Sequence, residues 1–413
     1  MAIGWPVFFA MAIAGLLVYL LYPNVMPDFI FAQSFVNGLD SYSFAAIPFF
    51  FLAGAIMNAG GMSRRLLNFA HALVGHIRGG LGHVNVVANV GMAGVSGSAV
   101  ADAAAIGSIL VPAMKQQGYS GGYAAAVTAA AATIGPIIPP SIPFVLFGLL
   151  TQVSVGKLFI AGIVPGFLMG IALFATTWWI GRRRSYPAEP FRGWRHVWAT
   201  GRDGLLALGM PAIIVFAKVG GLATTTEFGA VAVMYAAAVS LFVYRELTVR
   251  GLWLAVRQAA IEAISVLLIA SVAGIFVWIT ARFGLGRALS SWISGITTDP
   301  KVTLFIVAAL ILALGTVLEP VIILLVLVPI LVPVAIGAHI DLVHFGVVVV
   351  MATTIGLILP PIGFLIYLCG RQAQVSVVEV VRELRPFLVA LIFVLMTVVF
   401  VPEVSTFLPQ LTE

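Results

Sequence analysis

The sequence of 413 residues has very little charge and almost no cysteine. Only 9% of its residues are Asp, Glu, Lys or Arg, whereas 62% are hydrophobic. A soluble globular domain has about a quarter of its residues charged. The composition therefore excludes a soluble globular protein and indicates a polytopic membrane protein. The single cysteine, Cys369, excludes an internal disulfide and a cysteine-based metal cage.

Two sequence patterns that carry chemistry are also missing. Without His-Glu-x-x-His, the chain lacks the ligands and base of a metalloprotease, and the spacing of His71, His76 and His83 does not favour one helical face. Without Gly-x-x-x-x-Gly-Lys-Ser/Thr, it lacks a phosphate-binding loop for ATP. The net charge of +6 comes from arginines in short loops between apolar stretches, which suits a lipid bilayer and not nucleic acid. We therefore expect no enzyme, although an intramembrane enzyme and a passive channel or scaffold subunit remain as alternatives.

A short pattern occurs twice, 221 residues apart and without a gap. The first copy contains Gly94, Ile109-Leu110-x-Pro112 and Thr133-Ile134-Gly135-x-Ile137-x-Pro139-Pro140. The second copy contains Gly315, Ile330-Leu331-x-Pro333 and Thr354-Ile355-Gly356-x-Ile358-x-Pro360-Pro361. Each copy interrupts an apolar run and so predicts irregular backbone at membrane depth, which must be buried in protein or line a solvated cavity. Paired interruptions in two halves of a chain indicate a transporter's binding site.

Apolar stretches of about 20 residues, long enough to cross a bilayer, define the predicted spans. They are residues 3–22, 43–60, 120–149, 156–181, 222–244, 258–281, 342–370 and 386–403, with a shorter stretch at 204–219. The first has no basic leader or cleavage site, so we expect a retained helix and not a signal peptide.

The arginines orient these spans. The loop at 182–202 has six arginines and one glutamate, so it is predicted to be cytoplasmic. The other basic clusters fall on the same side only if residues 84–114 and 303–338 each enter and leave the membrane by one face. We therefore predict two re-entrant hairpins that enter from opposite sides, with residues 61–80 as an interfacial helix. The N-terminus is then cytoplasmic and the C-terminus periplasmic.

The tip of the first predicted hairpin is Gly94-Val-Ser96-Gly-Ser98-Ala-Val-Ala-Asp102. The segment predicted to face it is Gly135-Pro-Ile-Ile-Pro139-Pro140-Ser141, whose prolines remove hydrogen-bond donors and free carbonyls. Serine hydroxyls and free carbonyls are hard oxygen ligands, and they suit Na⁺ beside the ends of half-helices. The alternative is a small-residue motif for helix packing.

The second tip is Gly315-Thr316-Val-Leu-Glu319-Pro320, in which Glu319 takes the position of Ser98. A charge at the bilayer centre costs about 2.5 kcal/mol or more, so Glu319 and Asp102 are candidates for ion or proton coupling or for ordering the tips. The alternative role for each is a cap on backbone amides. Glu227 follows a Thr run and has the signature of a helix cap. Arg282 ends the span 258–281, where it either attracts an anion or extends to the interface.

At these motifs the chain resembles the large membrane subunit of TRAP (tripartite ATP-independent periplasmic) transporters over nearly its whole length. The resemblance rests on Ile47-Pro-Phe-Phe-Phe-Leu-Ala-Gly54, Gly79-Gly80-Leu81, Ser96-Gly-Ser-Ala99, Ile134-Gly-Pro-Ile-Ile-Pro-Pro-Ser141, Thr226-Glu227 and Ile355-Gly-Leu-x-x-Pro-Pro-x-Gly363. It implies Na⁺-driven uptake of an organic acid across the bacterial inner membrane by an elevator mechanism. A periplasmic binding protein would deliver the acid, and a small four-helix membrane subunit would complete the scaffold. The alternative is a carrier like the divalent-anion/sodium symporters that works without a binding protein.

The resemblance also implies which residues form the sites. The first Na⁺ site would use Ser96, Ser98, Gly135, Ile138 and Pro140, and the second would use Gly315, Thr316, Leu318, Gly356 and Leu359. Residues important for transport would be Ser98, Asp102, Ser141, Glu227, Arg282 and Glu319. The family usually has Asp at position 319 and Pro at position 225, where this chain has Glu and Thr.

The expected fold is therefore an all-α polytopic membrane protein with an inverted repeat, two re-entrant helical hairpins and two unwound helices. Its predicted parts are scaffold helices and the interfacial helix (1–80), the first half of the transport domain (81–150), further scaffold helices (151–300), the second half of the transport domain (301–371) and a C-terminal scaffold helix (372–413).

Overall fold

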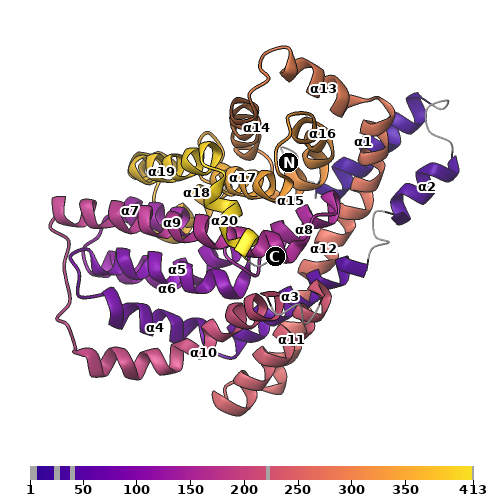
Figure 1. The fold of residues 1–413 in the computed structure, drawn as a ribbon. Helices are drawn as coiled ribbons and strands as arrows, with labels where there is room; N and C mark the ends of the chain where they lie inside the picture. Colours follow the sequence, from indigo (N-terminus) through magenta and orange to yellow (C-terminus); the bar gives the residue numbers. More distant parts are fainter. Residues whose placement is uncertain (1–6, 23–27, 38–41, 220–223, 412–413) are drawn as a thin grey trace.

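The computed structural model describes residues 7–22, 28–37, 42–219 and 224–411, and the secondary structure of these residues is helical. The beginnings of two predicted spans, residues 3–6 and 222–223, lie outside the described residues. The prediction of an all-α protein is confirmed for the part of the chain that the structure describes (Figure 1).

The first half of the chain runs from α1 to α9, and α10 leads into the second half. The elements are α1 (Val7–Leu21), α2 (Asp28–Asn37), the short η1 (Tyr42–Ala45), α3 (Ala46–Ala59), α4 (Met62–Val74), α5 (Gly80–Ser96), α6 (Ala99–Gln116), α7 (Gly121–Ala132), α8 (Ile142–Thr151), α9 (Val155–Arg183) and α10 (Trp194–Val219).

The second half follows the same order. Its elements are α11 (Thr225–Ala238), the π-helical η2 (Val239–Val243), α12 (Val249–Arg282), α13 (Leu285–Ser294), α14 (Pro300–Gly315), α15 (Pro320–Ile322), the π-helical η3 (Ile323–Leu327), α16 (Val328–Gly337), α17 (Leu342–Gly356), α18 (Phe364–Ala373), α19 (Val377–Phe400) and α20 (Glu403–Leu411).

The 221-residue repeat extends well beyond the motifs that reveal it. Shifted by that distance, α6 falls on α15, η3 and α16 together, α7 on α17, α8 on α18 and α9 on α19. The small helix α4 falls on α13 in the same way. Most of the helical order is thus duplicated, with α10 between the copies.

The described residues contain five helices long and apolar enough to cross a membrane. A sixth is possible if α3 and α4 are counted as one span, although a bend of 66° separates them. The five include Pro320–Gly337, the second arm of the predicted second hairpin. Length and composition alone therefore do not distinguish a re-entrant arm from a crossing helix.

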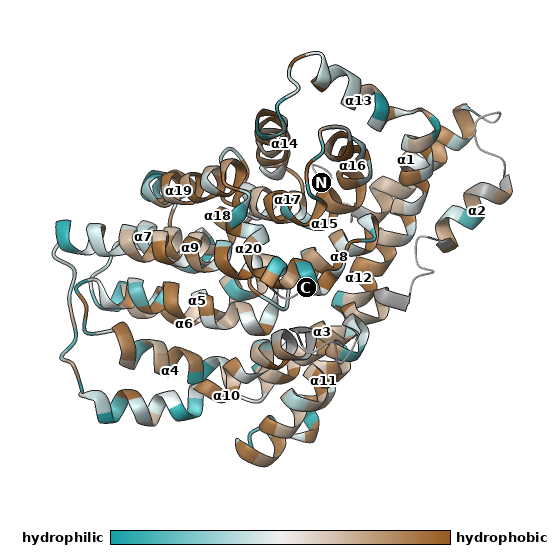
Figure 2. Cartoon of the chain, in the orientation of Figure 1, coloured by the Kyte–Doolittle hydropathy of each residue, from teal (hydrophilic) through white to brown (hydrophobic). Residues whose placement is uncertain are grey.

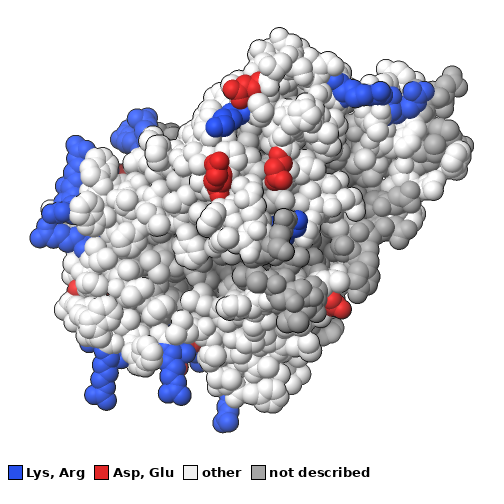
Figure 3. Space-filling view, in the orientation of Figure 1, with Lys and Arg blue, Asp and Glu red and all other residues white. Residues whose placement is uncertain are grey.

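Polar and charged residues are found mainly at the ends of the helices. Figure 2 shows largely hydrophobic helices with hydrophilic residues at the left, where α9 ends and α10 begins. Figure 3 shows that Lys and Arg side chains gather along the left and lower edges. This side of the molecule contains the arginine-rich connection between α9 and α10, which the sequence predicts to be cytoplasmic.

The helices pack in two groups. In the first group, α11 and α12 both pack on α3, and α1 and α2 pack on α12, which extends along the right of Figure 1. The helices that bear the repeated motifs pack with α9 and α19. We expected α9 and α19 in the scaffold, and their packing associates them with the motif-bearing helices. The division into moving and static parts itself stays a prediction.

Candidate functional site

One cavity of about 900 Å³ lies where the two hairpin tips meet the first group of helices. The first tip contributes Gly97 and Ser98, and the second contributes residues 315–321. The helices α3 and α12 form the opposite wall, with Phe51, Asn58, Gln258, Ile261, Glu262, Ser265 and Val266. The tips from both copies of the repeat thus line the same cavity. A cavity wide enough for water is where irregular backbone at membrane depth is tolerated.

The first tip consists of two residues between α5 and α6. Gly97 has a left-handed backbone with φ of 61°, and Ser98 caps α6 by accepting a hydrogen bond from Ala101 N at 3.4 Å. A Cβ atom at position 97 would lie 2.5 Å from the carbonyl oxygen of Pro140. Glycine is required here for its backbone conformation and for this close approach.

The first helix break joins α7 to α8. Between Ala132 and Ile142 the chain leaves the α-helix, and the Pro139–Pro140 peptide bond is cis. Ser141 caps α8 by accepting from Phe144 N at 3.2 Å, and its hydroxyl donates to the carbonyl of Pro136. The predicted unwound helix is therefore present. The Ser141 side chain stabilises it by bonding to the backbone on both sides of the double proline.

Asp102 lies between the first tip and the first break. Its side chain is 0% exposed, and its Oδ1 accepts a hydrogen bond of 2.5 Å from Ser96 Oγ. Its Oδ2 abuts Gly135 and has no hydrogen-bond partner among the described residues. A buried carboxylate oxygen without a donor is costly unless a cation or a proton satisfies it.

The second tip lies on the second break in the same manner. A Cβ atom at Gly315 would lie 3.0 Å from the Cα of Gly356, and Gly363 N donates to the carbonyl of Thr316 at 3.1 Å. The Pro360–Pro361 peptide bond is also cis. The structure thus brings Gly315 and Gly356 of the second predicted Na⁺ site together, and Thr316 contacts the end of the same break.

Glu319 is at the beginning of α15 and lines the cavity beside Leu318. It makes no side-chain capping hydrogen bond, so the structure does not support the capping alternative for this residue. Its counterpart Ser98 does cap its helix, although both occupy the same position in the repeat.

Of the six predicted transport residues, only Ser98 and Glu319 line the cavity. Asp102 and Ser141 are buried at the first tip and break, and Glu227 and Arg282 are exposed outside the cavity. Glu227 forms a capping box with Thr224, in which Thr224 N donates to Glu227 Oε2 at 2.5 Å and Glu227 N donates to Thr224 Oγ1 at 3.5 Å. Arg282 is the exposed last residue of α12. In this conformation the helix-cap alternative describes Glu227.

The residues Gln258 and Glu262 were missed in the sequence. Both lie on α12 and line the cavity, and Gln258 Nε2 donates to Glu262 Oε1 at 3.0 Å. A signal existed, because Glu262 is the only acidic residue inside the predicted span 258–281.

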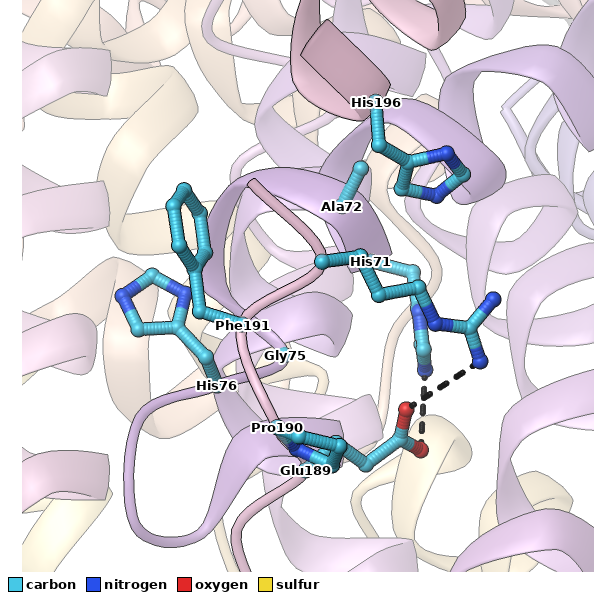
Figure 4. Close-up of a pocket in the computed structure, with 9 residues that line it drawn as sticks. His71, Ala72, Gly75, His76, Glu189, Pro190, Phe191 and His196 are labelled. Carbon is cyan, nitrogen blue, oxygen red and sulfur yellow. Dashed lines mark hydrogen bonds and ion pairs between the residues drawn. The ribbon is translucent and has the colours of Figure 1, made fainter. Parts of the chain in front are cut away.

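A second, much smaller pocket contains three histidines (Figure 4). His71 from α4 lies 3.1 Å from Glu189, which is also 4.0 Å from Arg192, and His196 comes from α10. His76 follows the end of α4 and His83 lies on α5 outside this pocket, so these two and His71 do not share one helical face, as expected. No group of three possible metal ligands occurs in the described residues, and the cluster connects α4 to the loop before α10.

The chain matches known transporters over almost its whole length. Residues 1–404 match the family of the tripartite ATP-independent periplasmic transporter DctM component. The chain is 38% identical over 402 residues to the 2,3-diketo-L-gulonate TRAP transporter large permease protein YiaN of Escherichia coli, with 97% of this chain and 94% of that protein covered. It is 37% identical to the sialic acid TRAP transporter large permease protein SiaM of Vibrio cholerae, with 99% and 95% covered.

Two further matches concern a longer relative and the fold. The sialic acid TRAP transporter permease protein SiaT of Haemophilus influenzae is 34% identical, and the match covers 100% of this chain and 67% of that protein. A crystal structure of the YdaH transporter of Alcanivorax borkumensis superposes with a TM-score of 0.62 at 15% identity, covering 89% of this chain and 86% of that chain. The latter supports the transporter fold alone. From the family match and these identities, the chain belongs to the DctM family of large permease subunits of TRAP transporters, which are multi-pass membrane proteins and not enzymes.

Proposed function

We propose that this subunit carries out Na⁺-coupled symport of an organic acid. The proposal rests on one observation: each hairpin tip lies on its own helix break, both contacts border one cavity, and the buried Asp102 at the first contact has an unpaired oxygen. A monovalent cation held by oxygen atoms satisfies that carboxylate.

The donor atoms at both contacts fit Na⁺. At the first, the hydroxyls of Ser96 and Ser98 lie opposite a break whose prolines have no N–H to donate. At the second, the backbone oxygens of the Gly315 tip and the Gly356 break would hold the ion. A bound cation offsets the negative charge of Asp102 and Glu319 and so favours an acidic substrate between the tips. Binding of Na⁺ and of the acid then favour one another reciprocally.

The transport step in this proposal is an elevator movement. The tips and breaks move as one unit against α3, α4, α10, α11 and α12, and carry the bound Na⁺ and acid across the bilayer. Crossing without ligands is disfavoured, because unpaired polar groups and charges are costly in a low-dielectric environment. The static wall is the one formed by α3 and α12.

The proposed assembly has three components in the bacterial inner membrane and periplasm. SiaT, of which this chain covers 67%, has additional sequence. We propose that here a separate small four-helix subunit takes the corresponding role and that a periplasmic binding protein delivers the acid. The cytoplasmic N-terminus and periplasmic C-terminus follow from the arginine distribution.

Transport by the purified subunits in proteoliposomes tests the proposal. An inward Na⁺ gradient should drive saturable uptake of the cognate acid only when the binding protein is added outside. Uptake that is saturable and Na⁺-dependent without the binding protein would favour the alternative carrier of the divalent-anion/sodium type. Uptake that neither saturates nor needs Na⁺ would contradict symport and indicate a channel.

A further inference from the structure

The cavity wall contains two carboxylates and no cationic side chain among its described lining residues. Glu262 comes from α12 and Glu319 from the second tip. The remaining polar side chains in the described wall are neutral: Asn58, Ser98, Gln258, Ser265 and Thr316. This composition is unexpected for a site that receives an anion, because no arginine or lysine there pairs with a carboxylate.

The two carboxylates belong to opposite sides of the cavity. Glu319 lies beside the second tip-and-break contact, where the proposed Na⁺ compensates negative charge. Glu262 lies on α12, within a helix of 34 residues long enough to span the membrane. An acidic residue inside such a helix usually faces a cavity and marks a ligand path.

The hydrogen-bonded pair Gln258 and Glu262 on α12 can accept one more hydrogen bond from a ligand. Gln258 Nε2 donates to Glu262 Oε1 at 3.0 Å, which holds the carboxylate and leaves its second oxygen, Oε2, for another partner. Ser265 does not compete for it, because its hydroxyl donates to the carbonyl of Ile261 at 2.7 Å. A carboxylate accepts hydrogen bonds and cannot donate them, so its partner must carry an O–H or N–H group.

We infer that Glu262, positioned by Gln258, recognises a hydroxyl or ammonium group of the substrate, so that the subunit carries a monocarboxylate bearing such donors rather than a simple dicarboxylate. This inference rests on the proposed Na⁺-coupled uptake of an organic acid. The substrate's single carboxylate faces the tips, where the beginnings of α6 and α15 and the bound Na⁺ supply positive potential. A second carboxylate would face Glu262, and two like charges about 4 Å apart repel by about 4 kcal/mol near a protein surface.

A cysteine reporter in the cavity tests this without measuring transport. Cys369 is the only cysteine and is buried, so Ser265→Cys introduces a single accessible thiol one helical turn from Glu262. The rate of N-ethylmaleimide labelling is measured on the purified complex with its small subunit, in sodium or choline chloride. The probes are D-gluconate and sialic acid, which bear hydroxyl donors, and succinate and propionate, which do not.

In Na⁺, gluconate or sialic acid should slow labelling at concentrations at least tenfold below those needed for succinate or propionate. Adding Glu262→Gln should raise the half-protecting concentration of the donor-bearing acid about tenfold or more, because a hydrogen bond to a charged acceptor is lost. Glu262→Asp should restore part of the effect. The matched control is Arg257→Gln, a charge change one residue from Gln258 outside the cavity wall, and it should leave protection unchanged.

The outcomes distinguish a failure of this inference from a failure of the proposed Na⁺-coupled symport. Equal protection by succinate, or protection unaffected by Glu262→Gln, overturns the inference while leaving Na⁺-dependent carboxylate binding intact. Absence of Na⁺-dependent protection by all four acids contradicts both the inference and the proposed function.

Discussion

Single residues at the two tips differ in ways that the repeat conceals. Ser98 and Glu319 are equivalent in sequence, yet Ser98 caps its helix and Glu319 makes no capping bond and borders the cavity. The negative charge associated with the first tip belongs instead to Asp102, buried behind Ser96. The two contacts are therefore alike in backbone and different in side-chain chemistry.

Ser98→Ala should raise the Na⁺ concentration for half-maximal uptake about fivefold, because it removes one oxygen ligand of moderate strength. The substitution also removes a helix cap, which costs about 1 kcal/mol of stability. Ser120→Ala is a matched control, since Ser120 caps α7 by accepting from Tyr123 N at 3.2 Å. Both variants should unfold earlier, but only Ser98→Ala should alter the Na⁺ dependence. An unchanged Na⁺ dependence in Ser98→Ala would remove its hydroxyl from the site.

At the residue scale, the sequence predicts sites that depend on backbone conformation. It does not predict contacts that depend on how distant helices pack together. Glycines and prolines at 97, 135 and 140 identify the tip and the break that contact each other. Nothing in the local pattern places Gln258 and Glu262 opposite them, because that depends on which face α12 presents to another element. Local signals did favour a helix cap at Glu227, and the capping box is there.

At the scale of elements, the recurring unit is a hairpin tip lying on a broken helix. The stretch 120–149 reads as one apolar span, and its double proline correctly predicts the break between α7 and α8. The charge distribution predicts the paired hairpins, because only turning back keeps the arginines on one side. The short α15 and the π-helical turn η3 in the second hairpin have no such signal, since apolar runs give the same pattern in both helix types.

Gly97→Ala tests the contact between the first tip and break. The added Cβ meets the Pro140 carbonyl, so we expect at least a tenfold loss of Na⁺-driven uptake with the protein still folded. Gly118→Ala is a control matched in backbone strain, because Gly118 has φ of 87° and an added Cβ atom there would meet no other atom within 4 Å. Each substitution costs about 1–2 kcal/mol from the left-handed conformation alone. Equal uptake by the two variants would mean that the contact itself is unimportant.

The helix α4 is attached at its beginning to the loop before α12. Glu246 accepts hydrogen bonds of 2.8 Å from both Arg64 and Arg65, and the Arg65 guanidinium lies 3.7 Å from the centre of the Tyr244 ring. The hydrogen bond from Arg65, together with the charges of both arginines, lowers the pKa of Glu246 below its ordinary value. The stabilisation is therefore complete above the ordinary pKa of a glutamate, and it is lost as the pH falls through the lowered one.

Glu246→Gln should accelerate amide hydrogen exchange in α4 about fivefold near pH 7, in line with about 1 kcal/mol for a well-formed exposed pair. The difference between variant and parent should shrink as the pH falls through the lowered pKa of Glu246, and it should vanish once the parent's carboxyl is neutral. Glu383→Gln is the comparison, because it breaks the pair of Glu383 with Arg184 and leaves α4 untouched. Equal exchange in Glu246→Gln and the parent at neutral pH would show that this pair does not hold α4.

At the scale of the whole molecule, the duplicated helical order gives two equivalent halves that share one cavity. The tips from both halves meet there, while α12 supplies most of the opposite wall. Each hairpin also contacts one short helix, α4 beside α5 and α13 beside α16. In the proposed elevator movement both tips and both breaks travel together, so each copy of the repeat contributes part of the moving site.

A crosslink between the halves of the proposed elevator tests whether they move. The Cβ atoms at Gly94 in α5 and Pro211 in α10 would be 3.2 Å apart, close to disulfide spacing. Oxidising the Gly94→Cys/Pro211→Cys pair should reduce Na⁺-driven uptake at least tenfold, and a reductant should restore it. The pair Gly204→Cys/Phe69→Cys joins α10 to α4 within the static part at 3.0 Å, and its oxidation should leave uptake intact. Since α5 must slide past α10 in every elevator cycle, full uptake with the first crosslink shown complete on a gel would exclude the elevator movement.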